Sequence, residues 1–111
     1  MGTNKRYPNI TPQRAEEREL REASKQGPLH TLSDEQLRLY SQVVSIAPTR
    51  PALWGLAWLR FGSVDVRCTV KVLRWTADAV GVEVDVEGTA ERCWIWQGAC
   101  QRLKKREDAW K

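Results

Sequence analysis

The side chains best suited to chemistry in this chain are one histidine, three cysteines and a run of carboxylates. His30 lies just before an expected helix start, where a role at the helix boundary is favoured over general-base catalysis. Glu83, Asp85 and Glu87 alternate along an expected strand, so pairing with basic residues on a neighbouring strand is favoured over acid–base work. The chain has no glycine-rich phosphate-binding motif. We therefore expect no catalytic residues and no enzymatic activity.

The three cysteines do not have the spacing of a metal site. Cys68, Cys93 and Cys100 form no closely spaced pair, and His30 is far from them in sequence. Cys68 and Cys93 occupy strand positions that otherwise hold valine or isoleucine. We predict reduced thiols in the core and neither metal nor cofactor, although one disulfide is compatible with the sequence.

Tryptophan and basic side chains give the strongest indication of a binding surface. The chain has six tryptophans among 111 residues, and strand alternation sends Trp94 and Trp96 away from the valine positions. Four cations complete the candidate partner-binding set: Arg67, Lys71, Arg74 and Arg92. Such a set can stack bases or form the centre of a protein interface. The alternative is a second small core, in which residues 33–46 or 49–61 cover both tryptophans.

The net charge of +4 is unevenly distributed along the chain. Residues 99–111 hold five basic and two acidic side chains, whereas residues 62–98 hold four basic and six acidic ones. Basic termini favour contact with polyanions, so Lys104, Lys105 and Arg106 are candidate polyanion contacts, or else a solubilising tail. The acidic body favours a protein partner, with nucleic acid as the alternative.

Composition and hydropathy indicate a folded protein without membrane spans. The chain is 41% hydrophobic and 29% charged, which excludes a fully disordered chain. The longest apolar stretch, residues 52–61, is interrupted by Arg60 and is too short to cross a bilayer. Residues 1–10 lack the apolar stretch of a secretory signal. We expect a cytoplasmic protein without membrane contact, and the oligomeric state is left open.

The first 28 residues are predicted to form a flexible charged arm with a marginal helix. Thr11 can cap that helix, and Pro12 suits its first position. Because its apolar content is small, we predict a solvated helix that a partner orders. A single α+β domain is expected at 29–103, followed by a basic tail at 104–111.

A second helix is predicted over residues 33–46. Ser33 can cap it while Gln36 reaches back to the cap, and its apolar residues share one broad face. This helix is expected to pack against a sheet and to stop before Pro48. A short turn and a strand over 57–61 are expected next.

Alternation of valine with charged residues predicts two strands, at 64–72 and 80–86. A bulge at Val72 would set it opposite Val82 and set Lys71 opposite Glu83. A third strand would place Trp96 opposite Gly81, and a short helical turn is expected over 98–103. The predicted core consists of Val66, Val70, Val72, Val82, Val84 and Ile95.

This meander, closed by a short turn after the segment WIWQGACQRL, resembles the SH3-like small barrels over residues 57–103. The aromatic ALYDY-type motif of signalling SH3 domains is absent, so recognition of proline-rich peptides is not implied. The size, the Arg/Ala/Val/Trp bias and the charged arm also look like accessory proteins of phages and mobile elements in high-GC bacteria. The expected fold is α+β, a small SH3-like barrel or curved antiparallel sheet preceded by one docked helix and a solvated N-terminal helix.

Two functions of different class are compatible with these patterns. The first is a small non-enzymatic protein-interaction module, an inhibitor or an assembly adaptor. The second is a nucleic-acid-binding accessory protein that uses its basic termini and its Trp/Arg face. The first is favoured because the body of the chain is acidic.

Overall fold

A computed structural model describes residues 11–110, so the expected arm at 1–10 lies outside the described residues. The helices are α1 (Pro12–Ser24), α2 (Asp34–Leu37) and three 3-10 helices, η2 (Leu39–Ser41), η3 (Gln97–Ala99) and η4 (Arg106–Trp110). The strands are β1 (Ser45–Ile46), β2 (Leu53–Phe61), β3 (Val64–Trp75), β4 (Ala79–Val86), β5 (Thr89–Trp96) and β6 (Cys100–Leu103).

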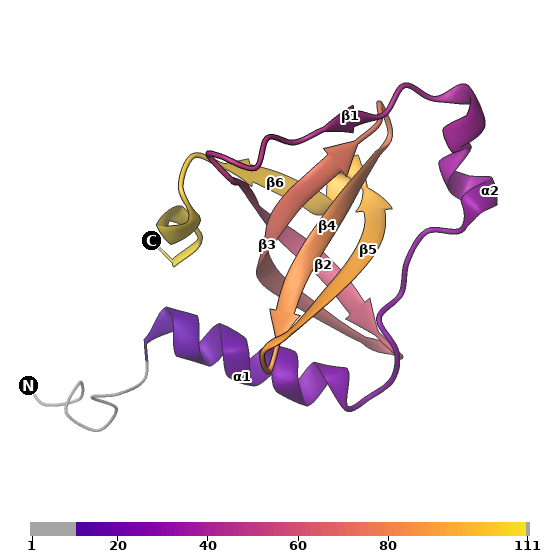
Figure 1. Cartoon of the computed structure of the whole chain (residues 1–111). Coiled ribbons are helices and arrows are strands. Elements are labelled where there is room, and N and C mark those ends of the chain that lie inside the picture. The colour runs from indigo at the N-terminus through magenta and orange to yellow at the C-terminus, as the bar shows by residue number, and fades with distance from the viewer. Residues whose placement is uncertain (1–10, 111) are drawn as a thin grey trace, which may run out of the picture.

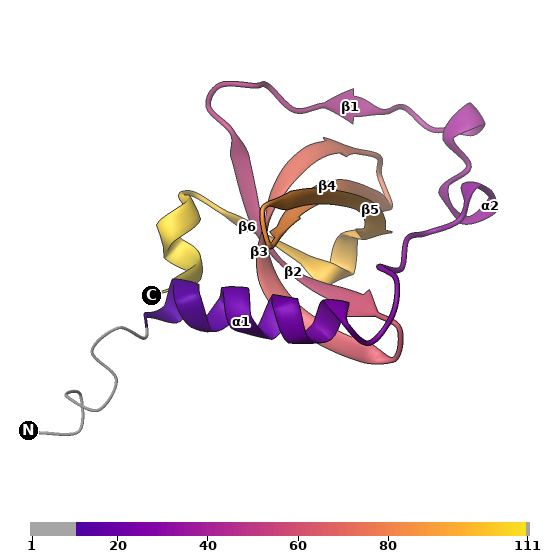
Figure 2. The same cartoon turned by 60° about the horizontal axis from the view of Figure 1, so that its bottom comes forward.

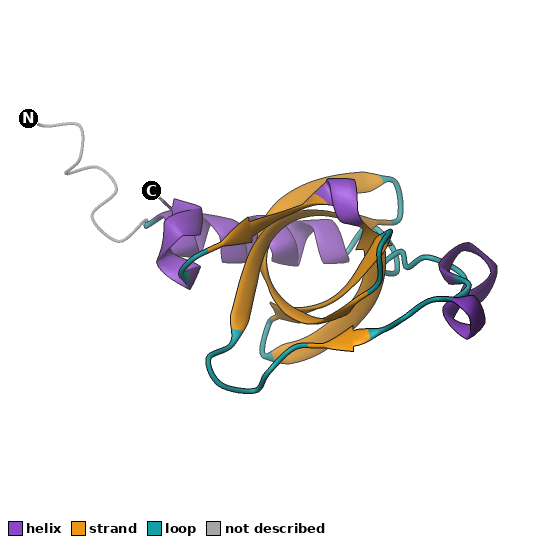
Figure 3. Ribbon diagram, turned by 90° about the horizontal axis from the view of Figure 1, so that it is seen from above, coloured by secondary structure: helices purple, strands orange, loops and turns teal. Residues whose placement is uncertain are grey.

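The strands form one antiparallel sheet in the order β5-β4-β3-β2-β6, and β1 pairs with the end of β3. The sheet curls around its own inner face (Figures 1 and 3) but does not close into a barrel. Residues 29–32 span part of the opening. The His30 N–H donates to the Arg60 carbonyl at 2.8 Å, and the Leu32 N–H donates to the Trp94 carbonyl at 3.0 Å. The α+β class is confirmed.

The core lies inside the curl and contains every residue predicted for it. Val66, Val70, Val72, Val82, Val84 and Ile95 are each at most 8% exposed and belong to one cluster. Phe61 and Leu59 of β2 supply its largest fully buried side chains. The inner face is apolar because alternate residues along each strand share one side of the sheet.

The register of β3 and β4 agrees with the prediction. Val72 pairs with Val82 and Lys71 with Glu83, and the register shifts between Val72 and Arg74, where the bulge was expected. Valine partners on the inner face and opposite charges on the outer face support this pairing.

The register of β4 and β5 differs from the prediction by two residues. Gly81 pairs with Trp94, and not with Trp96. The reason is the tight turn at Glu87 and Gly88, whose φ angles are +52° and +82°. Positive φ at both central residues is typical of a two-residue hairpin turn. Because a shift of two positions preserves the faces of a strand, both tryptophans still point outward.

The predicted solvated state of α1 is wrong. Leu20 and Ala23 are each 3% exposed and belong to the main core. The Glu16 carboxylate accepts hydrogen bonds from the Thr69 N–H at 2.7 Å and from the Thr69 hydroxyl at 3.0 Å. The helix runs across one end of the curled sheet (Figures 1 and 2). A narrow apolar stripe suffices there, because only the open end of the sheet needs cover. The predicted cap is confirmed, since the Arg14 N–H donates to Thr11 Oγ1 at 3.2 Å.

The predicted docked helix over 33–46 is also wrong. Ser33 and Gln36 form the expected capping box, but Arg38 adopts a left-handed conformation with φ of +48° and ends α2 after one turn. Residues 38–46 then form an arm that leads into β1 and protrudes from the body (Figure 2). Pairing of β1 with β3 satisfies backbone groups that a continued helix would have bonded internally. Tyr40 is consequently 89% exposed.

Two shorter predictions are corrected by strand pairing. The strand expected over 57–61 begins earlier, because all of β2 pairs with β3. The helical turn expected over 98–103 is limited to η3, and β6 then pairs with β2 from Ala57 to Trp54. The second edge of β2 was available for β6 to pair with, and local sequence did not indicate this.

Candidate functional site

Two tryptophans and two arginines of the predicted set gather on the outer face of β3, β4 and β5. We name Arg74, Arg92, Trp94 and Trp96 the Trp94 patch. Arg74, Gly81 and Trp94 pair in register across the three strands, so they share a face. A Cβ on Gly81 would lie 2.9 Å from Arg74 Cγ and 3.5 Å from the Trp94 ring. Both side chains therefore lie over the glycine backbone, and a Cβ there would force the Arg74 side chain to shift while making ordinary contact with the Trp94 ring.

The two tryptophans of the patch differ in exposure. Trp96 is 45% exposed, while Trp94 is half-buried. The backbone N–H of Trp94 donates to the Thr31 hydroxyl at 2.9 Å. Arg74, Arg92, Trp94 and Thr31 line a hollow of about 140 Å³. Among the described residues no helix covers the pair, and the segment ending at Leu32 bonds to the edge of β5, so Trp94 is partly covered while Trp96 is exposed.

The cations of the patch are not equivalent. Arg92 Nε donates to Glu83 Oε2 at 2.9 Å, across the β4–β5 pair. The guanidinium of Arg74 has no ion pair within the part of the chain that the structure describes. Arg74 is therefore the cation of the patch best placed to pair with a partner's carboxylate.

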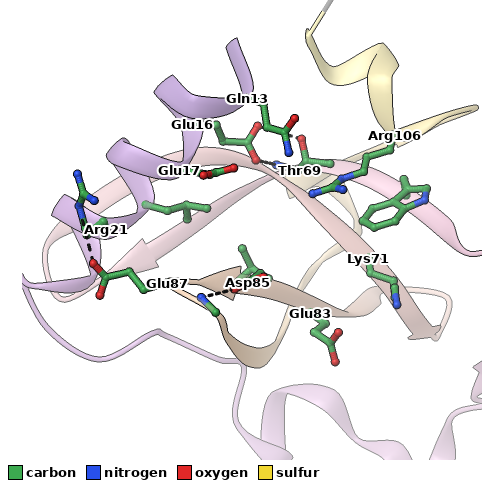
Figure 4. A pocket seen from close by; sticks show the side chains of 14 residues that line it. Gln13, Glu16, Glu17, Arg21, Thr69, Lys71, Glu83, Asp85, Glu87 and Arg106 are labelled. Carbon is green, nitrogen blue, oxygen red and sulfur yellow. Dashed lines mark hydrogen bonds and ion pairs between the residues drawn. The ribbon is translucent and has the colours of Figure 1, made fainter. Parts of the chain in front are cut away.

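Lys71 belongs to a separate charged cleft of about 480 Å³, formed by α1, β3, β4 and η4 (Figure 4). Its Nζ lies 5.9 Å from the centroid of the Trp54 ring, and the Arg106 guanidinium carbon lies 5.0 Å from it. Arg106 of the expected basic tail is thus folded against an aromatic ring. Lys104 and Lys105 remain exposed.

Carboxylates outnumber cations in this cleft, and most of them already have partners. Glu16 is bound to Thr69, and Glu87 forms an ion pair of 3.8 Å with Arg21. Asp85 Oδ1 accepts the Gly88 N–H at 2.8 Å. These contacts serve the docking of α1 and the β4–β5 turn.

Arg67 lies at a third place, opposite Trp58 in the β2–β3 pair. A groove of about 560 Å³ lies here between α1 and the β2–β3 hairpin, and we name it the α1 groove. Its apolar lining comes from Ala23, Trp58, Val64 and Val66. Trp58, which is 55% exposed, was not among the predicted site residues. Alternation through the whole of residues 53–61 was the signal that could have revealed it.

The cysteines occupy apolar positions and are free. Cys68 and Cys93 are buried, and Cys100 is half-buried. Burial raises the pKa of all three thiols, that of Cys93 to about 11. They are therefore protonated near neutral pH and are poor nucleophiles and ligands.

Among the side chains that the structure describes, no group of three histidine, cysteine or acidic residues is arranged to hold a metal ion. No helix within residues 11–110 is long and apolar enough to cross a membrane. Comparison with models of protein families, with curated proteins and with solved structures finds no match to this chain. Its function therefore has to be inferred from the chemistry of its own surfaces.

Proposed function

We propose that this chain is a small non-enzymatic protein-interaction module that binds a protein partner through the Trp94 patch. The observation that carries the proposal is the exposure of Trp96, at 45%, on the same sheet face as the half-buried Trp94 and as Arg74, which has no ion pair among the described residues. An exposed aromatic side chain has a cost in solubility that partner binding would explain. Tryptophan and arginine also contribute disproportionately to the free energy of protein interfaces.

The patch favours a partner with an apolar centre flanked by a carboxylate. Trp96 offers apolar ring surface, and the planar Arg74 guanidinium can bind a carboxylate in bidentate fashion. Both side chains project from paired strands, so the backbone that carries them is already ordered before they engage a partner. An inhibitor or an assembly adaptor, of the kind that phages and mobile elements encode, fits this description.

Nucleic-acid binding has less support from the same geometry. Glu83 compensates Arg92, and the cleft beside the patch carries more carboxylates than cations. A polyanion would approach an almost neutral face. As to architecture, we propose that the sheet is an open relative of the SH3-like barrels: it curls without closing, and residues 29–32 bond to both β2 and β5.

The test is partner capture from an extract of the native host, followed by affinity measurements on the purified partner. We compare the wild type with the double variant Trp96→Ser/Arg74→Glu, and use Trp58→Ser as a matched control on another face. The expected result is at least a tenfold loss of affinity, about 1.4 kcal/mol, in the double variant alone.

Equal affinity of all three proteins would overturn the proposal. So would capture of nucleic acid whose binding weakens steeply with salt, because that dependence reports phosphate contacts. Circular dichroism of the double variant excludes unfolding as the cause of any loss. Both substituted side chains are exposed, so we expect its spectrum to match that of the wild type.

A further inference from the structure

The arm at residues 38–46 presents an unusual amount of apolar surface to solvent. Its exposed large side chains are Leu39 (37%), Tyr40 (89%), Val43 (84%) and Ile46 (77%). The arm protrudes beside β5 and returns to the sheet at β1 (Figures 1 and 2). A segment that leaves this much apolar surface unburied is typical of a contact site.

The arm is attached to the body before its first residue and at its last. Before it, the Leu32 N–H donates to the Trp94 carbonyl. At its end, Ile46 pairs with Arg74, and the Ala47 N–H donates to the Leu73 carbonyl at 2.8 Å. These bonds fix the chain on either side of the arm at β5 and at the end of β3, whereas the α1 groove lies at the β2–β3 hairpin. The apolar side chains of the arm therefore do not reach the groove of their own chain.

The α1 groove has complementary apolar character. Ala23, Trp58, Val64 and Val66 line a space of about 560 Å³, within the size range of pockets that bind compact ligands. More than half of the Trp58 surface is exposed there. Side chains such as Tyr40 and Val43 could bury this surface and gain the free energy of apolar burial.

Charge also favours the pairing of arm and groove. Within the arm the one charged side chain is Arg38, and the nearest carboxylates, Asp34 and Glu35, precede it in α2. Three carboxylates line the groove against two arginines: Glu19, Glu22 and Asp65 against Arg18 and Arg67. Glu22 and Asp65 have ion pairs within the chain, while Glu19 has none among the described residues. Arg38 of an incoming arm can therefore pair with Glu19.

We infer that the occupant of the α1 groove is the arm of a second copy of this chain. The arm and the α1 groove are different surfaces, so the contact is heterologous and can repeat from one molecule to the next. Repetition forms a ring when the rotation closes and a filament when it does not. This self-association uses residues outside the Trp94 patch and goes beyond the proposed function.

Sedimentation velocity on the full chain, over micromolar to millimolar concentrations, tests the inference. The wild type should form species larger than a monomer as the concentration rises. An arm variant, Tyr40→Asp/Val43→Asp, and a groove variant, Trp58→Arg, should each stay monomeric. An equimolar mixture of the two should form a heterodimer and nothing larger, because one intact arm and one intact groove remain.

Exchanging the charges of Glu19 and Arg38, which are both exposed, provides an independent pair of variants. Glu19→Lys should weaken self-association at least tenfold, and combination with Arg38→Glu should restore it. The matched control is Trp96→Ser, which should self-associate like the wild type whether or not the Trp94 patch binds a partner. A wild type that is monomeric at millimolar concentration overturns the inference. So does a mixture of arm and groove variants that stays monomeric.

Discussion

Val84 and Val43 carry the same side chain in opposite environments, 2% and 84% exposed. Val84→Ala removes two methyl groups from the core, so we expect the free energy of unfolding to fall by roughly 1–3 kcal/mol. Val43→Ala should change it by less than about 0.5 kcal/mol. Urea denaturation at a concentration where the chain is monomeric measures both. Equal losses would place Val84 outside the core and reverse the faces of β4.

Because the thiols are buried, the free energy of unfolding depends on pH in the alkaline range. Burial raises the pKa of Cys93 from its ordinary value of 9.0 to about 11. Between these values the folded chain keeps the proton while the unfolded chain releases it. The stability contributed by this thiol is therefore complete below pH 9 and is lost as the pH rises toward 11, by at most ~1.4 kcal/mol per pH unit.

The measurement is urea denaturation of the wild type and of Cys93→Val from pH 7 to pH 10.5. Valine keeps an apolar group of similar size but does not titrate. We expect the wild type to lose stability more steeply above pH 9 than the variant. Parallel curves for the two proteins would show that Cys93 ionises as readily in the folded chain as in the unfolded one.

At the scale of elements, α1 depends on a single carboxylate as well as on its apolar stripe. Glu16 accepts two hydrogen bonds from Thr69, at 2.7 and 3.0 Å, whereas Glu17 is exposed. Glu16→Ala leaves the Thr69 N–H without this partner, and we expect a loss of about 1–3 kcal/mol. Glu17→Ala, its neighbour in the same helix, should change stability by less than about 0.5 kcal/mol. Thermal and urea denaturation compare the two, and equal effects would contradict this anchoring.

Elements were predictable from sequence where one strand face was purely apolar. The valines of β3 and β4 determined the faces of the strands, because a shift of one residue would expose them, and the opposite charges of Lys71 and Glu83 supported the register. Helices were harder to predict from sequence than strands. The segment 33–46 has the cap and the apolar spacing of a helix, yet Arg38 ends it and β1 pairs with β3. Conversely, the few apolar residues of α1 predicted a solvated helix, because local sequence does not reveal the open end of the sheet against which α1 packs.

At the scale of the molecule, curvature decided which predicted site residues meet. Alternation placed Arg67, Lys71 and Arg74 on strand β3, but it carried no information on how that strand bends. In the structure Arg74 lies in the Trp94 patch, Lys71 lines the charged cleft and Arg67 lines the α1 groove. The tryptophan pair was predictable, because its face depends on alternation alone. The groove was not, since it requires the docking of α1.

Amide hydrogen exchange followed by mass spectrometry tests the organisation of the whole molecule. Because Leu20 of α1 shares a core with Val70 of β3, we expect peptides from both elements to exchange only on global unfolding. The arm at residues 38–46 has no core residue and exposes most of its side chains, so its peptides should exchange far sooner. The residue type alone would suggest the reverse, since α1 is polar and the arm apolar. If α1 instead exchanges as early as the arm, the helix is not held by the core, and the α1 groove loses one of its walls.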